Sequence, residues 1–282
     1  MRDQGLVRPE AMLSEQPVPY DKPLPRQRLG RLASRVLWFE TVESTNDIAA
    51  SLVAGAPRGP RSVDGVVVVA DAQTAGRGRR GHTWFSPPGS GLYVSVVLTP
   101  GQAADAVRAT ALLTIAAGVA LAEAIEVATG LPVDLKWPND LYVSRRKLAG
   151  ILAEASVAGS SIDAVVLGYG INIGPAAYPP DLANRATSLE SELGRPVDRH
   201  DVFVETLARL AVRYDDLLAG RFDGILDAWR RRSPSAIGAR IQWTTPAGRA
   251  SAVTAGIDDD GALLVRTGEH IERIVAGEIA WS

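Results

Sequence analysis

The residues QTAGRGRRGHTWFS, from Gln73 to Ser86, form the stretch around which this 282-residue chain is organised. Arg77, Arg79 and Arg80 alternate there with glycines. Glycine lets a backbone adopt positive φ and approach a ligand closely, while arginine offers a planar, permanently charged fork that matches carboxylates and phosphates. We therefore predict a loop that binds anions. Because adjacent cations repel one another, we expect the loop to be mobile when empty and ordered by a bound anion.

The glycines of this arginine loop match the GxGxxG pattern of dinucleotide-binding folds only as letters. That fold requires a helix that opens at the last glycine and an acidic residue about 20 positions later. Here Pro87 and Pro88 follow closely, and they exclude such a helix. No GxxxxGK[ST] phosphate-binding loop occurs in the sequence either. We therefore do not expect a Rossmann fold.

The patterns on both sides of the loop predict an α/β fold. A strand at 36–42 is followed by a helix, for which Ser44 or Thr45 is a natural N-cap; these hydroxyls either cap the helix or bind a small polar ligand. Further apolar runs predict strands at 65–70, 91–98 and 163–173, a long helix over 103–128, a hairpin with arms at 142–143 and 148–155, and amphipathic helices over 200–218 and 222–231.

Composition divides the chain into three parts. Residues 1–30 are rich in proline and arginine without apolar periodicity, so we expect a disordered tail. Residues 31–235 carry the α/β pattern and form the expected catalytic domain. Residues 236–282 show short, closely spaced strands, which predict a small β-barrel.

Charge and cysteine content limit the possible functions. The formal net charge of −2 opposes a general polyanion binder, because such binding needs a broad basic face. The absence of cysteine excludes disulfides and thiolate chemistry, and it fits a reducing compartment. The start of the chain lacks the apolar run of a signal peptide, and the apolar stretch 111–122 is shorter than the roughly 20 residues of a membrane span. We expect a cytoplasmic protein without membrane contact.

The charged residues near the apolar strands favour phosphoryl chemistry. The set comprises several cations and one carboxylate, namely Arg77, Arg79, Arg80, Lys136, Lys147 and Asp140. Such a set suits the attack of a carboxylate on a nucleotide phosphate, because the protein must neutralise two anions that approach each other. Only three histidines occur and no GxSxG elbow surrounds a serine, so a serine-histidine triad is not expected.

Together these motifs resemble those of the biotin protein ligases. The strings STN (44–46), QTAGRGRRGHTW (73–84), KWPNDLY (136–142), KLAGILAE (147–154) and GYGINI (168–173) occur in the order found in that family. The resemblance extends from about Arg35 to the end of the chain. It implies a mixed-sheet α/β catalytic domain related to class II aminoacyl-tRNA synthetases and lipoate ligases, followed by an SH3-like barrel.

The resemblance also implies a reaction in two steps. Biotin and ATP, with Mg²⁺ present, would give biotinyl-5′-AMP and pyrophosphate, and a lysine of a biotin carboxyl carrier domain of acetyl-CoA or acyl-CoA carboxylase would then receive the biotin. The roles implied for single residues are biotin binding by Ser44, Thr45, Asn46, Gln73, Gly76, Arg77, Lys147 and Gly150; ATP and adenylate binding by Arg77, Arg79, Arg80, Trp84, Asn139 and Asn172; and catalysis by Lys147, Arg79 and Asp140, with Asp140 as a candidate Mg²⁺ ligand.

Two alternatives remain open at this point. A lipoate–protein ligase shares the fold, but lipoate has no urea group for the STN residues to bind. A DNA-binding repressor would use the same arginines on phosphates, but the proline-rich start of the chain is too short for a helix-turn-helix domain. We therefore expect a monofunctional ligase without DNA binding, as a monomer or a weak homodimer.

Overall fold

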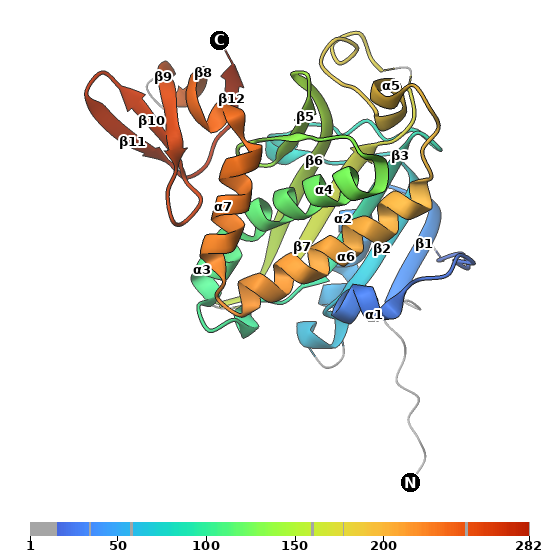
Figure 1. The fold of residues 1–282 in the computed structure, drawn as a ribbon. Coiled ribbons are helices and arrows are strands. Elements are labelled where there is room, and N and C mark those ends of the chain that lie inside the picture. The colour runs from blue at the N-terminus through green and yellow to red at the C-terminus, as the bar shows by residue number, and fades with distance from the viewer. Residues whose placement is uncertain are drawn as a thin grey trace.

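The fold consists of a large mixed sheet covered by helices and a small antiparallel sheet at the C-terminal end (Figure 1). It is taken from a computed structural model, which describes residues 16–33, 35–56, 59–158, 161–176, 178–245 and 248–281. The α-helices are α1 (Arg26–Leu29), α2 (Thr45–Ala54), α3 (Ala106–Ala111), α4 (Leu113–Thr129), α5 (Leu189–Leu193), α6 (Arg199–Leu218) and α7 (Phe222–Arg232). The short 3₁₀ helices are η2 (Gly30–Ala33), η3 (Pro60–Val63), η4 (Arg79–Gly81), η5 (Pro100–Gln102) and η6 (Pro234–Ala236).

The large sheet has seven strands in the order β1-β2-β3-β7-β6-β5-β4. They are β1 (Arg35–Val42), β2 (Val66–Gln73), β3 (Gly91–Leu98), β4 (Asp134–Lys136), β5 (Asp140–Val143), β6 (Arg146–Ala158) and β7 (Ser161–Asn172). Strands β1 and β2 are parallel, and the other neighbours are antiparallel. The predicted α/β class with a mixed sheet is confirmed.

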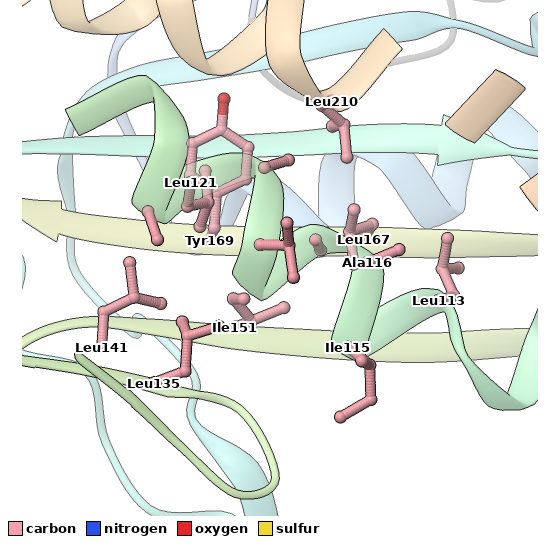
Figure 2. Close-up of a cluster of buried hydrophobic side chains, with 14 of the residues drawn as sticks. Leu113, Ile115, Ala116, Leu121, Leu135, Leu141, Ile151, Leu167, Tyr169 and Leu210 are labelled. Carbon is pink, nitrogen blue, oxygen red and sulfur yellow. The ribbon is translucent and has the colours of Figure 1, made fainter. Parts of the chain in front are cut away.

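Helices cover both faces of the large sheet, which explains why its central strands are apolar throughout. Every residue of β3 is buried. Helices α4 and α6 lie side by side across one face, and α2 packs against the other (Figure 1). Figure 2 shows the core on the α4 side, where Leu121 of α4 and Leu210 of α6 meet Ile151 and Leu167 of the strands. This core fixes the ends of β5, β6 and β7, which carry polar residues of the site.

One predicted element differs in the structure. The single helix expected over 103–128 is two helices, α3 and α4, which meet at Leu112 with φ −86° and ψ −2°. Leu112 is fully buried, so its side chain packs into the core at the bend. The apolar spacing continues through the break, and for this reason the sequence pattern predicts one helix.

The small sheet has five strands in the order β11-β10-β9-β8-β12. They are β8 (Ile237–Thr245), β9 (Gly248–Ile257), β10 (Leu263–Thr267), β11 (His270–Ile274) and β12 (Ile279–Trp281). Among the residues that the structure describes, β11 and β12 remain edge strands, so the predicted barrel is not closed. A buried hydrogen bond ties this sheet to the large domain, because Trp137 Nε1 donates to the carbonyl oxygen of Gly261 at 2.9 Å.

The N-terminal segment differs from the expected disordered tail in its described part, residues 16–30. Val18 forms a β-bridge with Trp38 on the edge strand β1, and the Tyr20 and Trp38 rings stack with centroids 5.1 Å apart. Leu29 of α1 is fully buried. These aromatic and apolar contacts give the segment a packing partner that its composition did not indicate. Residues 1–15 lie outside the described residues.

Among the described residues, no helix has the length and apolar character needed to span a bilayer.

Candidate active site

A cavity of about 930 Å³ collects nearly all the predicted site residues. Its wall includes the start of α2, the arginine loop, the β5–β6 hairpin, the end of β7 and the C-terminal strand β12. Of the predicted residues, Gly76 alone does not line it. Gly76 is buried under the loop, where its carbonyl oxygen accepts a hydrogen bond from the Trp84 backbone N–H at 2.8 Å. The structure therefore brings together motifs that are separated by up to about half of the chain.

The polar end of the cavity is built around the start of α2. Gln73 Oε1 accepts two hydrogen bonds from Thr45, one from its backbone N–H at 2.9 Å and one from its side-chain hydroxyl at 3.1 Å. Gln73 Nε2 in turn donates to the Ser86 hydroxyl at 2.9 Å. Ser44 occupies the N-cap position, but its side chain makes no capping hydrogen bond. The Ser44 hydroxyl, which is almost fully buried, is thus available to a ligand.

Asn46 lies beside this pair and is held from two sides. Its Nδ2 donates to Glu154 Oε2 at 2.5 Å, and its Oδ1 lies 2.5 Å from the Ser95 hydroxyl. The second N–H of the Asn46 amide is left for a ligand. Thr45, Asn46 and Gln73 therefore form a preorganised network, in which part of each side chain is used by the protein itself.

Glycines on β6 and β7 allow large side chains to approach the sheet closely. A methyl group at Gly168 would overlap the Asn46 amide, and one at Gly170 would overlap the Trp84 indole. A Cβ at Gly150 would lie 3.0 Å from Trp84 Cζ3. Trp84 therefore rests on a floor of two glycines, with its Nε1 buried and without a hydrogen-bond partner among the described residues.

The arginine loop folds back on itself through its backbone. Gly78 N–H donates to the carbonyl oxygen of His82 at 2.7 Å, and Arg77 and Thr83 form a β-bridge. Arg80 adopts φ 56°, which is unusual for a residue other than glycine. The expectation that this loop is mobile when empty stays a prediction.

The three loop arginines have different surroundings. Arg77 Nη2 lies 2.8 Å from Asp47 Oδ1 and 2.9 Å from Glu154 Oε2, so it is held by two carboxylates near the polar end of the cavity. Arg79 donates to Asn139 Oδ1 at 3.4 Å and to the Gly277 carbonyl oxygen at 3.3 Å. Burial lowers the pKa of Arg79, and the charge of Asp140 partly offsets this effect. A half-buried cation with neutral partners is well placed to receive an anion.

The β5–β6 hairpin places Lys147 in the middle of the cavity wall. Ser144 and Arg145 form its tip with positive φ values of 48° and 66°. Lys147 Nζ lies 2.7 Å from Asp140 Oδ1 and 5.3 Å from the centre of the Trp84 ring. The Lys147 backbone N–H donates to the carbonyl oxygen of Arg185 at 2.7 Å, which joins the hairpin to the segment before α5. This ammonium group therefore lies between the polar network and the other cations.

A second lysine is enclosed by aromatic rings from both domains. Lys136 Nζ lies 4.4 Å from the centre of the Trp281 ring and 5.2 Å from that of Tyr142. Burial lowers the pKa of Lys136; Asp140 acts in the opposite direction and Lys147 adds to the lowering. Trp281 belongs to β12, so the small domain contributes directly to the cavity.

Two predicted asparagines are hydrogen-bonded to the protein backbone. Asn139 Nδ2 donates to the Ile151 carbonyl oxygen at 2.6 Å, and Asn172 Nδ2 donates to the Thr187 carbonyl oxygen at 2.9 Å. Both residues line the cavity. Each asparagine is therefore held in place by a backbone carbonyl oxygen at the cavity wall.

The described residues contain no group of three or more histidine, cysteine, aspartate or glutamate side chains that could hold a metal ion. Asp140 is the carboxylate nearest the cationic cluster, and its Oδ1 is buried without a hydrogen bond. A single carboxylate fits a magnesium ion that is bound mainly through nucleotide phosphates.

Several residues in or next to the cavity were not identified from the sequence. Glu154 contacts the lining residues Asn46 and Arg77, and its position at the end of the KLAGILAE string was the one available signal. Trp281 belongs to the last strand, β12, and Glu278 directly precedes it; this part of the sequence carries no motif. The segment around Tyr178 and Arg185 also lines the cavity, although its sequence reads only as a polar connection.

Comparisons with protein families match both domains. The family model described as "Biotin/lipoate A/B protein ligase family" matches residues 38–172, and that described as "Biotin protein ligase C terminal domain" matches residues 236–281. The two matches include every strand of the large sheet except the first three residues of β1, and all strands of the small sheet.

The chain is also similar to individual ligases. It is 33% identical over 250 residues to the bifunctional ligase/repressor BirA of Bacillus subtilis, covering 88% of this chain and 74% of that protein. It is 35% identical over 224 residues to the biotin–[acetyl-CoA-carboxylase] ligase of Paracoccus denitrificans, covering 75% and 88%. The structure resembles the Aquifex aeolicus biotin protein ligase in complex with biotin and ATP, with a TM-score of 0.72, 28% identity and coverage of 88% of this chain and 99% of that one.

Proposed function

This chain belongs to the biotin protein ligase family, and we propose that it activates biotin with ATP and transfers it to a lysine of a carrier domain. The observation that carries the proposal is that one cavity has a hydrogen-bonding end and a positively charged end. The network of Thr45, Asn46 and Gln73 offers directed donors and acceptors. Lys136, Lys147 and Arg79 supply positive charge. A urea with a carboxylate tail fits the first end, and nucleotide phosphates fit the second.

In the first step, the carboxylate of biotin attacks the α-phosphate of ATP, an acyl–phosphate bond forms, and pyrophosphate leaves. Two anions approach each other, so cations that contact both lower the barrier. Lys147 lies between the two ends of the cavity and is the residue we assign to this role. Arg79 and Lys136 are assigned to the phosphates, with Arg80 on the exposed side of the loop.

A magnesium ion would supply further neutralisation of the phosphates when it is bound with ATP. Asp140 would hold this ion together with phosphate oxygens, because this carboxylate lies beside both Lys147 and Lys136. Asn139 and Asn172 are assigned to the nucleotide side of the cavity, and Trp84 to the wall between biotin and the adenylate. Gly150 is assigned to the biotin side of the cavity, where the absence of a side chain leaves room for Trp84 and Lys147 to approach the β6 backbone.

In the second step, the amine of a carrier lysine attacks the acyl carbon of the mixed anhydride and AMP leaves with the bonding electrons. Before this, the arginine loop excludes water from the anhydride. We propose the biotin carboxyl carrier domain of acetyl-CoA carboxylase as the acceptor, a proposal supported by the names of the relatives in Paracoccus denitrificans and Mycobacterium tuberculosis. The second relative is 30% identical over 294 residues, covering 99% of this chain and 98% of that protein.

The experiment that tests the reaction is exchange of labelled pyrophosphate into ATP. We expect exchange that depends on biotin and Mg²⁺. Mass spectrometry of a carrier domain incubated with the protein, biotin and Mg-ATP should then show the gain of one biotinyl group. Equal exchange with lipoate would support a lipoate ligase instead, and no exchange with either acid would reject the proposed reaction.

We further propose that the chain acts without a repressor function. The formal net charge of −2 supports this, because non-specific DNA binding needs a basic face. A gel shift with DNA that weakens steeply with added salt would contradict the proposal.

A further inference from the structure

Glu154 connects the polar end of the cavity to the arginine loop through one carboxylate oxygen. Its Oε2 lies 2.5 Å from Asn46 Nδ2 and 2.9 Å from Arg77 Nη2. Asn46 belongs to α2, Arg77 to the loop and Glu154 to β6. Three segments that are far apart in the sequence therefore meet at a single acceptor.

The first consequence concerns the orientation of the Asn46 amide. An ionised carboxylate only accepts hydrogen bonds, so the group that faces Glu154 must be the NH₂ of the amide. The Asn46 oxygen then faces the Ser95 hydroxyl at 2.5 Å, and the remaining N–H is free to meet a ligand. Without the carboxylate, the Asn46 amide can adopt either of its two orientations. In one of them the amide oxygen, an acceptor, faces the ligand where the N–H donor is needed.

The second consequence concerns the loop. Of its three arginines, Arg77 is the one for which the described residues provide carboxylate partners, Asp47 and Glu154. Arg77 also makes a β-bridge to Thr83, so an interaction that fixes Arg77 also stabilises the folded loop. The Glu154 carboxylate therefore orients the Asn46 amide toward the ligand and also fixes one end of the arginine loop, which covers the ligand.

We propose that Glu154 is a positioning residue for biotin, which couples the orientation of Asn46 to closure of the arginine loop. This inference rests on the proposed function. It assigns to Glu154 an effect on biotin affinity and loop protection, and none on the affinity for ATP. Within the described part of the chain, the polar partners of the Glu154 side chain are Asn46 and Arg77, so we assign it no part in the chemical step.

A purely structural role makes a different prediction. The side chains of Glu154 and Arg77 are 39% and 41% exposed, and exposed ion pairs contribute little to stability. If Glu154 served only the fold, its substitution would leave biotin affinity and loop cleavage unchanged relative to global unfolding. Measurements on the folded protein therefore separate the two roles.

The test compares three variants for biotin KM in pyrophosphate exchange, biotin affinity by calorimetry, and tryptic cleavage after Arg77, Arg79 and Arg80, followed by mass spectrometry. Glu154→Leu removes both contacts, and its biotin KM should rise about 10- to 100-fold, as expected for loss of a hydrogen bond to a charged group. Cleavage in the loop should be faster, and biotin should protect less. The KM for ATP should stay within about threefold of wild type, because nothing in the phosphate region changes.

Two conservative variants divide the roles. Glu154→Gln keeps an acceptor for Asn46 but loses the charge opposite Arg77, so biotin KM should recover to within about fivefold of wild type while loop cleavage stays fast. Asp47→Asn removes the other carboxylate of Arg77 and leaves the Asn46 contact, so it should speed cleavage with little change in biotin KM.

The outcomes separate this inference from the proposed function. If wild-type protein shows no biotin-dependent exchange, the proposed function fails. If wild type is active and Glu154→Leu has normal biotin KM and normal loop cleavage, the role of Glu154 is rejected. If Glu154→Leu raises the KM values for biotin and ATP equally, the residue acts on the whole fold and the inference is also rejected.

Discussion

Lys147 Nζ lies 2.7 Å from Asp140 Oδ1 across the β5–β6 hairpin, with the two side chains 32% and 18% exposed. The contact is an ion pair without the alignment of a hydrogen bond, because this buried oxygen accepts no hydrogen bond from the described residues. The lysine is therefore paired with a carboxylate at the cavity wall, while its N–H groups can still turn toward a ligand. An arriving carboxylate or phosphate oxygen would find a cation that is already in place.

Replacement of Lys147 by alanine should lower the rate of adenylate formation by about 10²–10⁴-fold, the range expected for loss of a charge contact in the transition state. The measurement is biotin-dependent pyrophosphate exchange. Arg146→Ala serves as a control, because Arg146 is the neighbouring cation and pairs with Glu192 outside the cavity. A rate for Lys147→Ala that equals that of the control would show that the hairpin has been assigned the wrong role.

The affinity for ATP should weaken as the pH rises, and at a lower pH than expected for a site with an ordinary lysine, because of Lys136. Burial lowers the pKa of Lys136, so the native protein loses this proton at a lower pH than the unfolded chain. The KM for ATP should therefore rise as the pH passes the lowered pKa. Between the two pKa values the unfolded state holds more protons, so this group makes stability increase with pH in that window.

Lys136→Arg tests this origin, because an arginine stays charged across the same range. We expect the alkaline rise in KM for ATP to disappear in the variant when both proteins are measured from about pH 7 to about pH 10. An unchanged alkaline rise in Lys136→Arg would mean that another group titrates.

Arg79→Gly should weaken retention of the adenylate. Arg79 joins the loop to Asn139 and to the Gly277 carbonyl oxygen, so its loss removes both a cation beside the phosphates and a tie between the loop and the small domain. Released adenylate should label lysines of a bystander protein, and rapid filtration should show faster loss of labelled adenylate from the enzyme. Retention equal to wild type, with normal pyrophosphate exchange, would refute this role.

The sequence predicted the fold and the residues that line the cavity better than it predicted which of those residues contact one another. β-branched runs and motif order were enough to place Lys147 and the arginine loop in one cavity. The pairing of Arg77 with Asp47 and Glu154 was not predictable, because the two carboxylates lie on elements whose approach depends on the sheet order β3-β7-β6. Trp281 was missed because its role depends on how the two domains pack.

The remaining differences have similar causes. The spacing of apolar residues does not reveal a helix break such as that at Leu112. The spacing of strands does not determine whether a small sheet closes into a barrel. Residues 16–30 pack through Tyr20 and Leu29, two residues in a stretch whose average composition is polar. Average properties of a segment therefore predict less than the few side chains that make its contacts.

The contact between Trp84 and the glycine floor gives a stability prediction. A Cβ at Gly170 would overlap the Trp84 indole, so Gly170→Ala should destabilise the protein by about 1–3 kcal/mol through overpacking. Thermal unfolding should show a melting temperature lower by roughly 2–4 °C for each kcal/mol in a chain of this size. Gly224→Ala in α7 is the control. No atom lies within 4 Å of its Cβ position, so this variant should gain about 0.5–1 kcal/mol as an exposed helix glycine replaced by alanine.

A double-variant cycle identifies the indole as the cause. In a Trp84→Ala background the overlap no longer exists, so the destabilisation by Gly170→Ala should largely disappear, and the two changes should couple by about 0.5–3 kcal/mol. Because Trp84 also lies 5.3 Å from the Lys147 ammonium group, a displaced indole in Gly170→Ala should weaken biotin-dependent exchange even at temperatures where the protein is folded. Strictly additive effects on stability would show that Trp84 does not rest on this glycine in solution.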